Sequence, residues 1–215
     1  MFRNDLITNL IVQFIFTAVA GWADTAGFLI VAHVFVSFMS GNSTQLMVAL
    51  VQNNLIITLT MIVVITGFVF GVIIGEIVRH KVKKRFTFIV LLLESIALWL
   101  VIIFVFLGGS KFFFLPIFSF AMGLHNTSLY KENSLLVKTY ISGTLVSLGQ
   151  AIAKAYVSRE NLKLVLNPLI VFIGFVIGAI TGALISNYIS HLISLIILAL
   201  MVSFMMLCSI FIGSK

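Results

Sequence analysis

The second half of the chain repeats the motifs of the first half in the same order. Gly21-Trp22-Ala23-Asp24-Thr25 corresponds to Gly123-Leu124-His125-Asn126-Thr127. Further along, Ser40-Gly41-Asn42 corresponds to Ser142-Gly143-Thr144, and the interval between the two motifs is the same in both halves. The chain therefore consists of two related copies.

The composition of the chain indicates that both copies lie in a membrane. The chain is 61% hydrophobic and 9% charged, with a mean hydropathy of +1.25, whereas soluble domains carry about 25% charged residues. We therefore expect an integral membrane protein whose main partner is the lipid bilayer. Residues 1–108 and 109–215 form the two copies within a single membrane domain, and duplicated membrane proteins of this kind are often carriers with a site where the copies meet.

Six stretches are long enough to cross the hydrocarbon core, which needs roughly 20 apolar residues. They are about Leu10–Val34, Leu55–Val78, Phe86–Leu107, Phe112–Tyr130, Leu164–Ile185 and Ile189–Ile212. Two shorter segments, Ser43–Val51 and Thr144–Val157, each follow a Ser-Gly tripeptide. We expect each to be a half-helix, re-entrant or interfacial, opened by a turn at Gly41 or Gly143 and capped by Ser or Asn.

The basic residues predict the orientation of the spans. With the N-terminus in the cytoplasm, all of the 13 Lys and Arg residues except Lys111 fall on the cytoplasmic side. An odd number of spans in each copy then inverts the second copy relative to the first. The expected fold is an all-α membrane protein of two inverted three-span repeats, in a bacterial inner membrane, with both termini cytoplasmic. The net charge of +7 reflects topology, so we expect no nucleic-acid partner.

Asp24 lies inside the first span, where a carboxylate costs roughly 2.5–3.5 kcal/mol on insertion scales. One interpretation is a cation or proton site lined also by His33, Asn42, His125 and Asn126, with Asp24 and His125 brought together as a proton relay. The other is a structural carboxylate that caps backbone groups at a helix break after Gly21.

The two Ser-Gly motifs extend this candidate site. Non-helical backbone at membrane depth is tolerated against protein or a water-filled cavity, and half-helix N-termini present free N–H groups. Thr144 is then the counterpart of Asn42, and Gln45 and Gln150 add amide groups inside each half-helix. The alternative is a solvated connecting loop. Gly21, Gly41, Gly123 and Gly143 are the candidate turn and hinge residues.

Six further glycines recur at intervals of four residues on one face of a helix in each copy. This spacing lets helix backbones approach closely, so we expect the two related helices to pack on each other, or to slide as the copies rock. The six are Gly67, Gly71, Gly75, Gly174, Gly178 and Gly182. Glu94, in the third span, has no counterpart in the second copy. It is expected to pair with a polar neighbour or to serve as a protonation site.

The sequence contains no phosphate-binding loop, dinucleotide fingerprint, Cys pair or His-Glu-x-x-His motif. Its histidines lack the spacing of a metal site, and its one cysteine, Cys208, lies in an apolar run. We expect neither an enzyme nor a bound cofactor or metal.

The motifs support a resemblance over nearly the whole chain. Ala20-Gly21-x-x-Asp24-x-x-Gly27-Phe28, Phe38-Met39-Ser40-Gly41-Asn42 and the Gly123 and Ser142 motifs resemble the YoaK family of bacterial inner-membrane proteins, whose domain has no assigned function. The family pattern has Thr in place of Ser40 and Ser142, and Gln in place of His125. The resemblance implies six spans, a bacterial membrane and a transporter-like role, but no particular activity.

Two functional hypotheses remain. The first is a small secondary transporter of a small polar metabolite or ion, coupled to protons or cations through Asp24, for which a homodimer is a reasonable assembly. The second is a scaffold or accessory protein that binds a partner protein or a lipid without transport. The transporter requires a cavity that opens to one side at a time, whereas the scaffold requires a dry interior.

Overall fold

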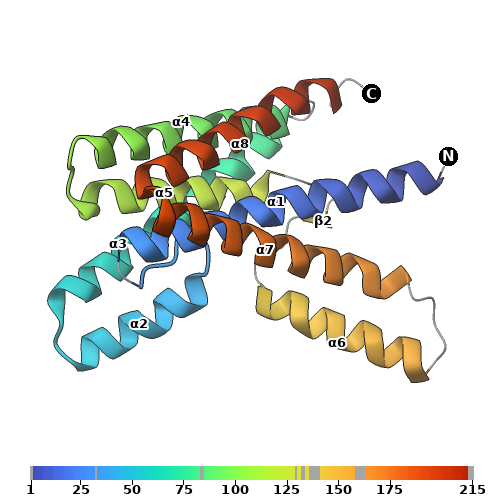
Figure 1. Cartoon of the computed structure of the whole chain (residues 1–215), viewed down its shortest axis with the longest axis horizontal. Helices are drawn as coiled ribbons and strands as arrows, with labels where there is room; N and C mark the ends of the chain where they lie inside the picture. The colour runs from blue at the N-terminus through green and yellow to red at the C-terminus, as the bar shows by residue number, and fades with distance from the viewer. Residues whose placement is uncertain are drawn as a thin grey trace.

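The structure is a computed structural model that describes residues 2–31, 33–82, 85–128, 130–131, 134–135, 141–157 and 163–212. Its described elements are α1 (Phe2–Ile30), α2 (Met39–Val51), α3 (Leu55–Lys81), α4 (Phe86–Phe106), α5 (Lys111–Thr127), β1 (Tyr130–Lys131), β2 (Ser134–Leu135), α6 (Ile141–Val157), α7 (Lys163–Tyr188) and α8 (His191–Ile212). The two short strands pair antiparallel. Among the described residues, the regular structure is thus helical apart from this strand pair (Figure 1).

In the described residues, five helices are long and apolar enough to cross a membrane: α1, α3, α4, α7 and α8. The sixth expected span is shorter than predicted, because α5 has 17 residues and ends at Thr127. Its apolar part, Phe112–Thr127, falls below the length of the other five. At about 1.5 Å per residue, α5 is about 25 Å long, somewhat less than the hydrocarbon thickness of about 30 Å.

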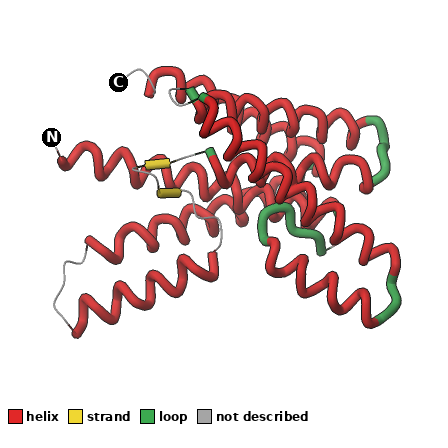
Figure 2. Tube along the Cα trace, turned by 180° about the vertical axis from the view of Figure 1, so that it is seen from behind, coloured by secondary structure: helices red, strands yellow, loops and turns green. Residues whose placement is uncertain are grey.

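Helices from the two halves pack on each other in a reciprocal pattern. The most extensive contacts join α1 to α7 and α3 to α5, and α4 packs against both α5 and α8. The shorter helices α2 and α6 pack on α3 and α7. They lie toward opposite ends of the bundle, on the same side of the molecule in both views (Figures 1 and 2).

Glycines explain why the first two pairs are so close. A Cβ atom on Gly71 would lie far inside contact distance of the Phe120 carbonyl oxygen of α5, and Gly123 meets α3 in the same way at Phe68. Gly178 and Gly21 make the equivalent approach between α7 and α1. Backbone contacts of this kind are the main attraction between helices that lipid tails solvate equally well.

This packing corrects two predictions. The helices with the four-residue glycine spacing, α3 and α7, pack on α5 and α1 of the other half, where we expected them to pack on each other. Gly21 and Gly123 lie inside continuous helices and serve close packing, so neither is a turn or hinge, and α1 has no break after Gly21.

The Ser-Gly motifs are also placed differently from the prediction. Gly41 and Gly143 lie in the first turns of α2 and α6, which begin at Met39 and Ile141. The residue before α2, Phe38, provides no side-chain cap. The turn that we expected at Gly41 lies earlier, at His33, whose φ is 72°, and the backbone from Val34 to Phe38 is non-helical.

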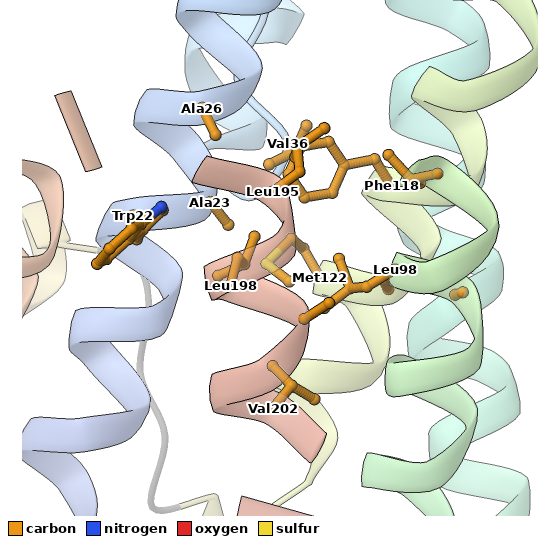
Figure 3. Close-up of a cluster of buried hydrophobic side chains, with 14 of the residues drawn as sticks. Trp22, Ala23, Ala26, Val36, Leu98, Phe118, Met122, Leu195, Leu198 and Val202 are labelled. Atoms are coloured by element: carbon orange, nitrogen blue, oxygen red, sulfur yellow. The ribbon is translucent and has the colours of Figure 1, made fainter. Parts of the chain in front are cut away.

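The core lies where α1, α4, α5 and α8 meet. Figure 3 shows Trp22 and Ala23 of α1, Leu98 of α4, Phe118 and Met122 of α5 and Leu198 of α8 in this region. Val36, from the non-helical segment, is fully buried in the same cluster. Many large apolar side chains outside the core are exposed, as expected of a surface that faces lipid.

Candidate functional site

The non-helical segment 34–38 is bonded to α1 by a single carboxylate. Asp24 Oδ1 accepts hydrogen bonds from the backbone N–H groups of Val36 (2.9 Å), Ser37 (2.6 Å) and Phe38 (3.3 Å). Oδ2 accepts one from the Ser37 hydroxyl at 3.0 Å. These N–H groups immediately precede α2, so the carboxylate also lies at the positive end of that helix. Asp24 therefore compensates the buried backbone of this segment.

Asn42 of α2 ties the same segment from the other side. Its Nδ2 donates to the Phe35 carbonyl oxygen at 2.6 Å, and its Oδ1 accepts from the Phe35 N–H at 3.2 Å. Gln45 donates from Nε2 to the His33 carbonyl oxygen at 2.8 Å. Asp24, Asn42 and Gln45 thus satisfy backbone groups that have no helical partner, which non-helical chain at membrane depth requires.

The spacing of the first motif follows from this arrangement. Gly27, one turn after Asp24, lets the segment cross α1, because a Cβ atom there would lie 2.8 Å from a Val36 methyl group and 3.2 Å from the Val34 carbonyl oxygen. Gly21, one turn before Asp24, faces α7. The motif thus combines one helix contact, one carboxylate anchor and one crossing point.

A second polar cluster joins α5 to α4 and α1. His125 of α5 is fully buried, and its Nδ1 lies 2.8 Å from Glu94 Oε1 of α4. Its Nε2 lies 2.9 Å from the Phe16 carbonyl oxygen of α1. We call Glu94 and His125 the buried pair; the Phe16 carbonyl oxygen is its acceptor on α1. Phe16 also lies against the imidazole, with ring centroids 5.2 Å apart.

Glu94 was expected either to pair with a neighbour or to be a protonation site, and the structure shows the pairing. Its second oxygen, Oε2, is buried and has no hydrogen-bond partner within the described part of the chain. The predicted contact of His125 with Asp24 is wrong, because Glu94 and Phe16 occupy both ring nitrogens. The apolar surroundings of Glu94 in the sequence gave no sign of which histidine would reach it.

None of the described contacts of the other predicted site residues in the second half joins them to either cluster. Asn126 donates from Nδ2 to the Met122 carbonyl oxygen at 3.0 Å. Residues 138–140, which correspond in the repeat to 36–38, lie outside the described residues. Thr144 is buried in α6, and Gln150 is exposed on that helix. The predicted single site is thus distributed over separate positions.

A pocket of about 640 Å³ lies near the end of the bundle where α1 and α4 end and α3 and α5 begin. Its polar lining residues are His33, Gln45 and Thr60, and apolar ones include Val105 of α4 and Phe114 of α5. This volume suits a small molecule. His33 and Gln45 were candidate site residues in the sequence analysis, but no sequence pattern indicated the other walls, which come from separate segments.

An apolar layer separates this pocket from the buried pair. Val105 and Phe114 line the pocket, and they lie eleven residues from Glu94 and His125 along α4 and α5, or about 16 Å along each helix axis. Leu98, Phe118 and Met122 are buried in the interval and belong to the same hydrophobic cluster (Figure 3). The pocket and the pair are therefore not continuous in this conformation.

In the described residues, no group of three or more His, Cys, Asp or Glu side chains could hold a metal ion. The described clusters can form hydrogen bonds to buried backbone, through Asp24 and Asn42, and can exchange a proton between Glu94 and His125.

Comparison with known proteins agrees with the resemblance seen in the motifs. The chain is 26% identical over 178 residues to the UPF0700 transmembrane protein YoaK of Bacillus subtilis (strain 168), covering 79% of this chain and 76% of that protein. No solved structure matches. Residues 12–208 match the family described as a protein of unknown function, DUF1275. The chain thus belongs to this family of YoaK-like membrane proteins, whose function is not assigned.

Proposed function

We propose that the protein is a small secondary transporter built from two inverted three-span repeats, with α1, α3 and α4 in one repeat and α5, α7 and α8 in the other. The observation that carries this proposal is the position of His125. This residue of the second repeat is bonded to Glu94 and to the Phe16 carbonyl, both of the first. A buried ionisable group in a membrane protein is a functional candidate by default, and this one joins the two repeats.

The helix contacts support the inverted repeat. The first span of each repeat packs on the second span of the other, the third spans α4 and α8 pack together, and each short helix packs on the second span of its own repeat. A pseudo-twofold axis in the membrane plane generates such reciprocal contacts. The distribution of Lys and Arg supports a cytoplasmic location for the N-terminus and for α6.

The pocket then opens toward the extracytoplasmic side, next to the segment that Asp24 and Asn42 hold. The layer of Leu98, Phe118 and Met122 closes it from the buried pair. Alternating access requires such a barrier on one side at a time. We therefore assign the pocket as the external entrance for a small metabolite or ion, and the barrier as the part that must move.

Proteoliposomes with an internal pH dye would test this function. The vesicles are exposed in turn to amino acids, organic acids, amines, Na⁺ and K⁺, and solute-dependent proton movement is recorded against protein-free vesicles. Proton movement that depends on any one of these solutes supports the proposal. For that solute, single cysteines at Thr60 and Thr144 in a Cys208→Ser background should then change their labelling in opposite directions.

A scaffold without transport is the second candidate, and one observation favours it. All of the described hydrogen bonds of Asp24 go to the 36–38 segment, and neither of the two described pockets is lined by Asp24, Asn42, Glu94 or His125. Labelling at Thr60 and Thr144 that stays constant with every solute, together with no solute movement, would support the scaffold.

A further inference from the structure

The hydrogen bonds of His125 determine how many protons the buried pair holds. A carbonyl oxygen accepts hydrogen bonds and does not donate them, so the Phe16 oxygen requires a hydrogen on Nε2. The contact between Nδ1 and Glu94 Oε1 requires one further proton, carried by either the nitrogen or the carboxyl group. The described geometry thus contains one shared proton in addition to the one on Nε2.

With the shared proton, the pair is neutral overall. It is either an imidazolium next to a carboxylate or a neutral imidazole next to a carboxylic acid. Both residues are fully buried and Glu94 Oε2 has no partner within the described residues. A net charge in such a place is unfavourable, because both side chains are buried and no second donor in the described residues reaches Oε2.

Release of the shared proton to water breaks one of the two contacts. The products are a carboxylate and an imidazole with a single N–H. If that hydrogen stays on Nε2, the unprotonated Nδ1 faces the carboxylate and their hydrogen bond is lost. If it moves to Nδ1 to bond Glu94, the bond to the Phe16 carbonyl is lost. The pair can bond α4 and α1 at once only while the proton is bound.

We propose that Glu94 and His125 form the proton-binding site of this protein, and that the bound proton locks α5 of the second repeat to α1 and α4 of the first. This inference rests on the proposed transport function, for which it names the coupling ion and replaces Asp24 as its site. Proton loss frees one helix contact across the repeat junction, and this is the contact that a rocking motion between the repeats must break.

No other described ionisable group competes for this proton. The elements packed against α4 and α5 are α1, α3 and α8. On α1, Asp24 is bonded to the 36–38 segment.

The ionisable groups of α3 and α8 lie near the ends of those helices. On α3, Glu76 bonds Arg79 and His80 at the helix end that also carries Lys81. On α8, His191 is exposed at the first residue and Cys208 lies in the last turns. Arg85 immediately precedes α4.

Nitrogen NMR of the histidine rings tests the proposal without any substrate. The full-length protein is labelled with ¹⁵N-histidine in lipid nanodiscs, and His125→Gln identifies the His125 signals. In the wild type we expect the Nδ1 signal to move between protonated and unprotonated positions as pH is raised. Ring signals of His125 that do not change with pH would overturn the proposal.

Two acid variants sharpen the result. In Glu94→Gln the side-chain amide can donate to Nδ1 while Nε2 still donates to Phe16, so both contacts persist without an exchangeable acid. We expect the pH-dependent shift of His125 to disappear. Glu76→Gln, the matched control at the end of α3, should leave that shift as in the wild type.

Transport assays separate this inference from the proposed function. Solute-driven proton movement that is unchanged in Glu94→Gln would refute the coupling site and leave the transporter standing. A His125 signal that titrates in a Glu94-dependent way, in a protein that moves none of the tested solutes, would refute the transporter and leave the proton-binding site standing.

Discussion

Replacement of Asp24 by alanine should destabilise the protein far more than replacement by asparagine. Alanine removes the acceptor of the N–H groups of Val36, Ser37 and Phe38 and of the Ser37 hydroxyl. An unsatisfied buried donor costs about 1–3 kcal/mol. We take the lower bound for each of the four groups and expect a loss of about 4 kcal/mol.

Asparagine keeps most of these contacts. Its amide oxygen can replace Oδ1 as the acceptor of the three backbone bonds, and the Ser37 hydroxyl can turn to accept from the amide nitrogen. Bonds to a neutral group are weaker than bonds to a carboxylate, but the amide carries a smaller desolvation penalty. We therefore expect a loss of only about 1 kcal/mol for Asp24→Asn.

Thermal unfolding in detergent measures the difference. At about 2–4 °C per kcal/mol for a chain of this length, Asp24→Ala should lower the midpoint by about 8–16 °C and Asp24→Asn by about 2–4 °C. Equal midpoints for the two variants would refute the anchor role. If Asp24→Asn instead unfolded like the wild type but lost transport, the coupling role first expected for Asp24 would be restored.

Three further predictions follow from the packing and the loop. Gly71→Ala should lower stability by about 1–3 kcal/mol, because its Cβ meets the backbone of α5; Gly149→Ala, with nothing within 4 Å of the added atom, should unfold at or slightly above the wild-type temperature. Asn42→Ala should cost about 2 kcal/mol through its two bonds to Phe35, measured in the same assay. Ser37→Ala should cost about 1 kcal/mol, since the backbone bond of Ser37 to Asp24 remains.

The helices themselves were predictable because hydropathy and length determine them directly. The predicted spans agree with α1, α3, α4, α7 and α8 to within a few residues at most ends. The exception is α5, where apolar residues alone suggested a helix to Tyr130. The hydroxyls of Thr127 and Ser128 bond carbonyls three residues earlier, at the end of the helix. Side-chain hydroxyls can compete with the helical bonds in this way.

The roles of the motif residues were less accessible from sequence. A glycine before a polar residue looks the same whether it opens a turn or meets another helix. Gly21 meets Phe175 and Gly123 meets Phe68, and both partners lie far away in the sequence. Asp24 does cap backbone groups, as one of the two interpretations expected. These groups follow His33, and no glycine or proline in the sequence indicates a turn at that position.

The partner of Glu94 could not be identified from sequence, since it depends on how α4 and α5 are rotated. The buried residues of α4 at and after Glu94 include Leu98 and Val101, which place one face toward the core. On α5 the corresponding stripe is Phe118, Met122 and His125. The two stripes become opposite each other only when α5 packs against both α3 and α4.

The two buried acids of this protein differ in the kind of partner that they have. Asp24 accepts three of its hydrogen bonds from backbone N–H groups, and these donors keep their protons when the pH changes. Glu94 shares its proton with an imidazole and keeps one oxygen without a described partner. The first arrangement is suited to holding a fixed segment, and the second to changing state. The donors to Asp24 Oδ1 are backbone N–H groups, whereas the partner of Glu94 is an imidazole that can gain or lose a proton. This difference favours Glu94 over Asp24 as the site of proton coupling.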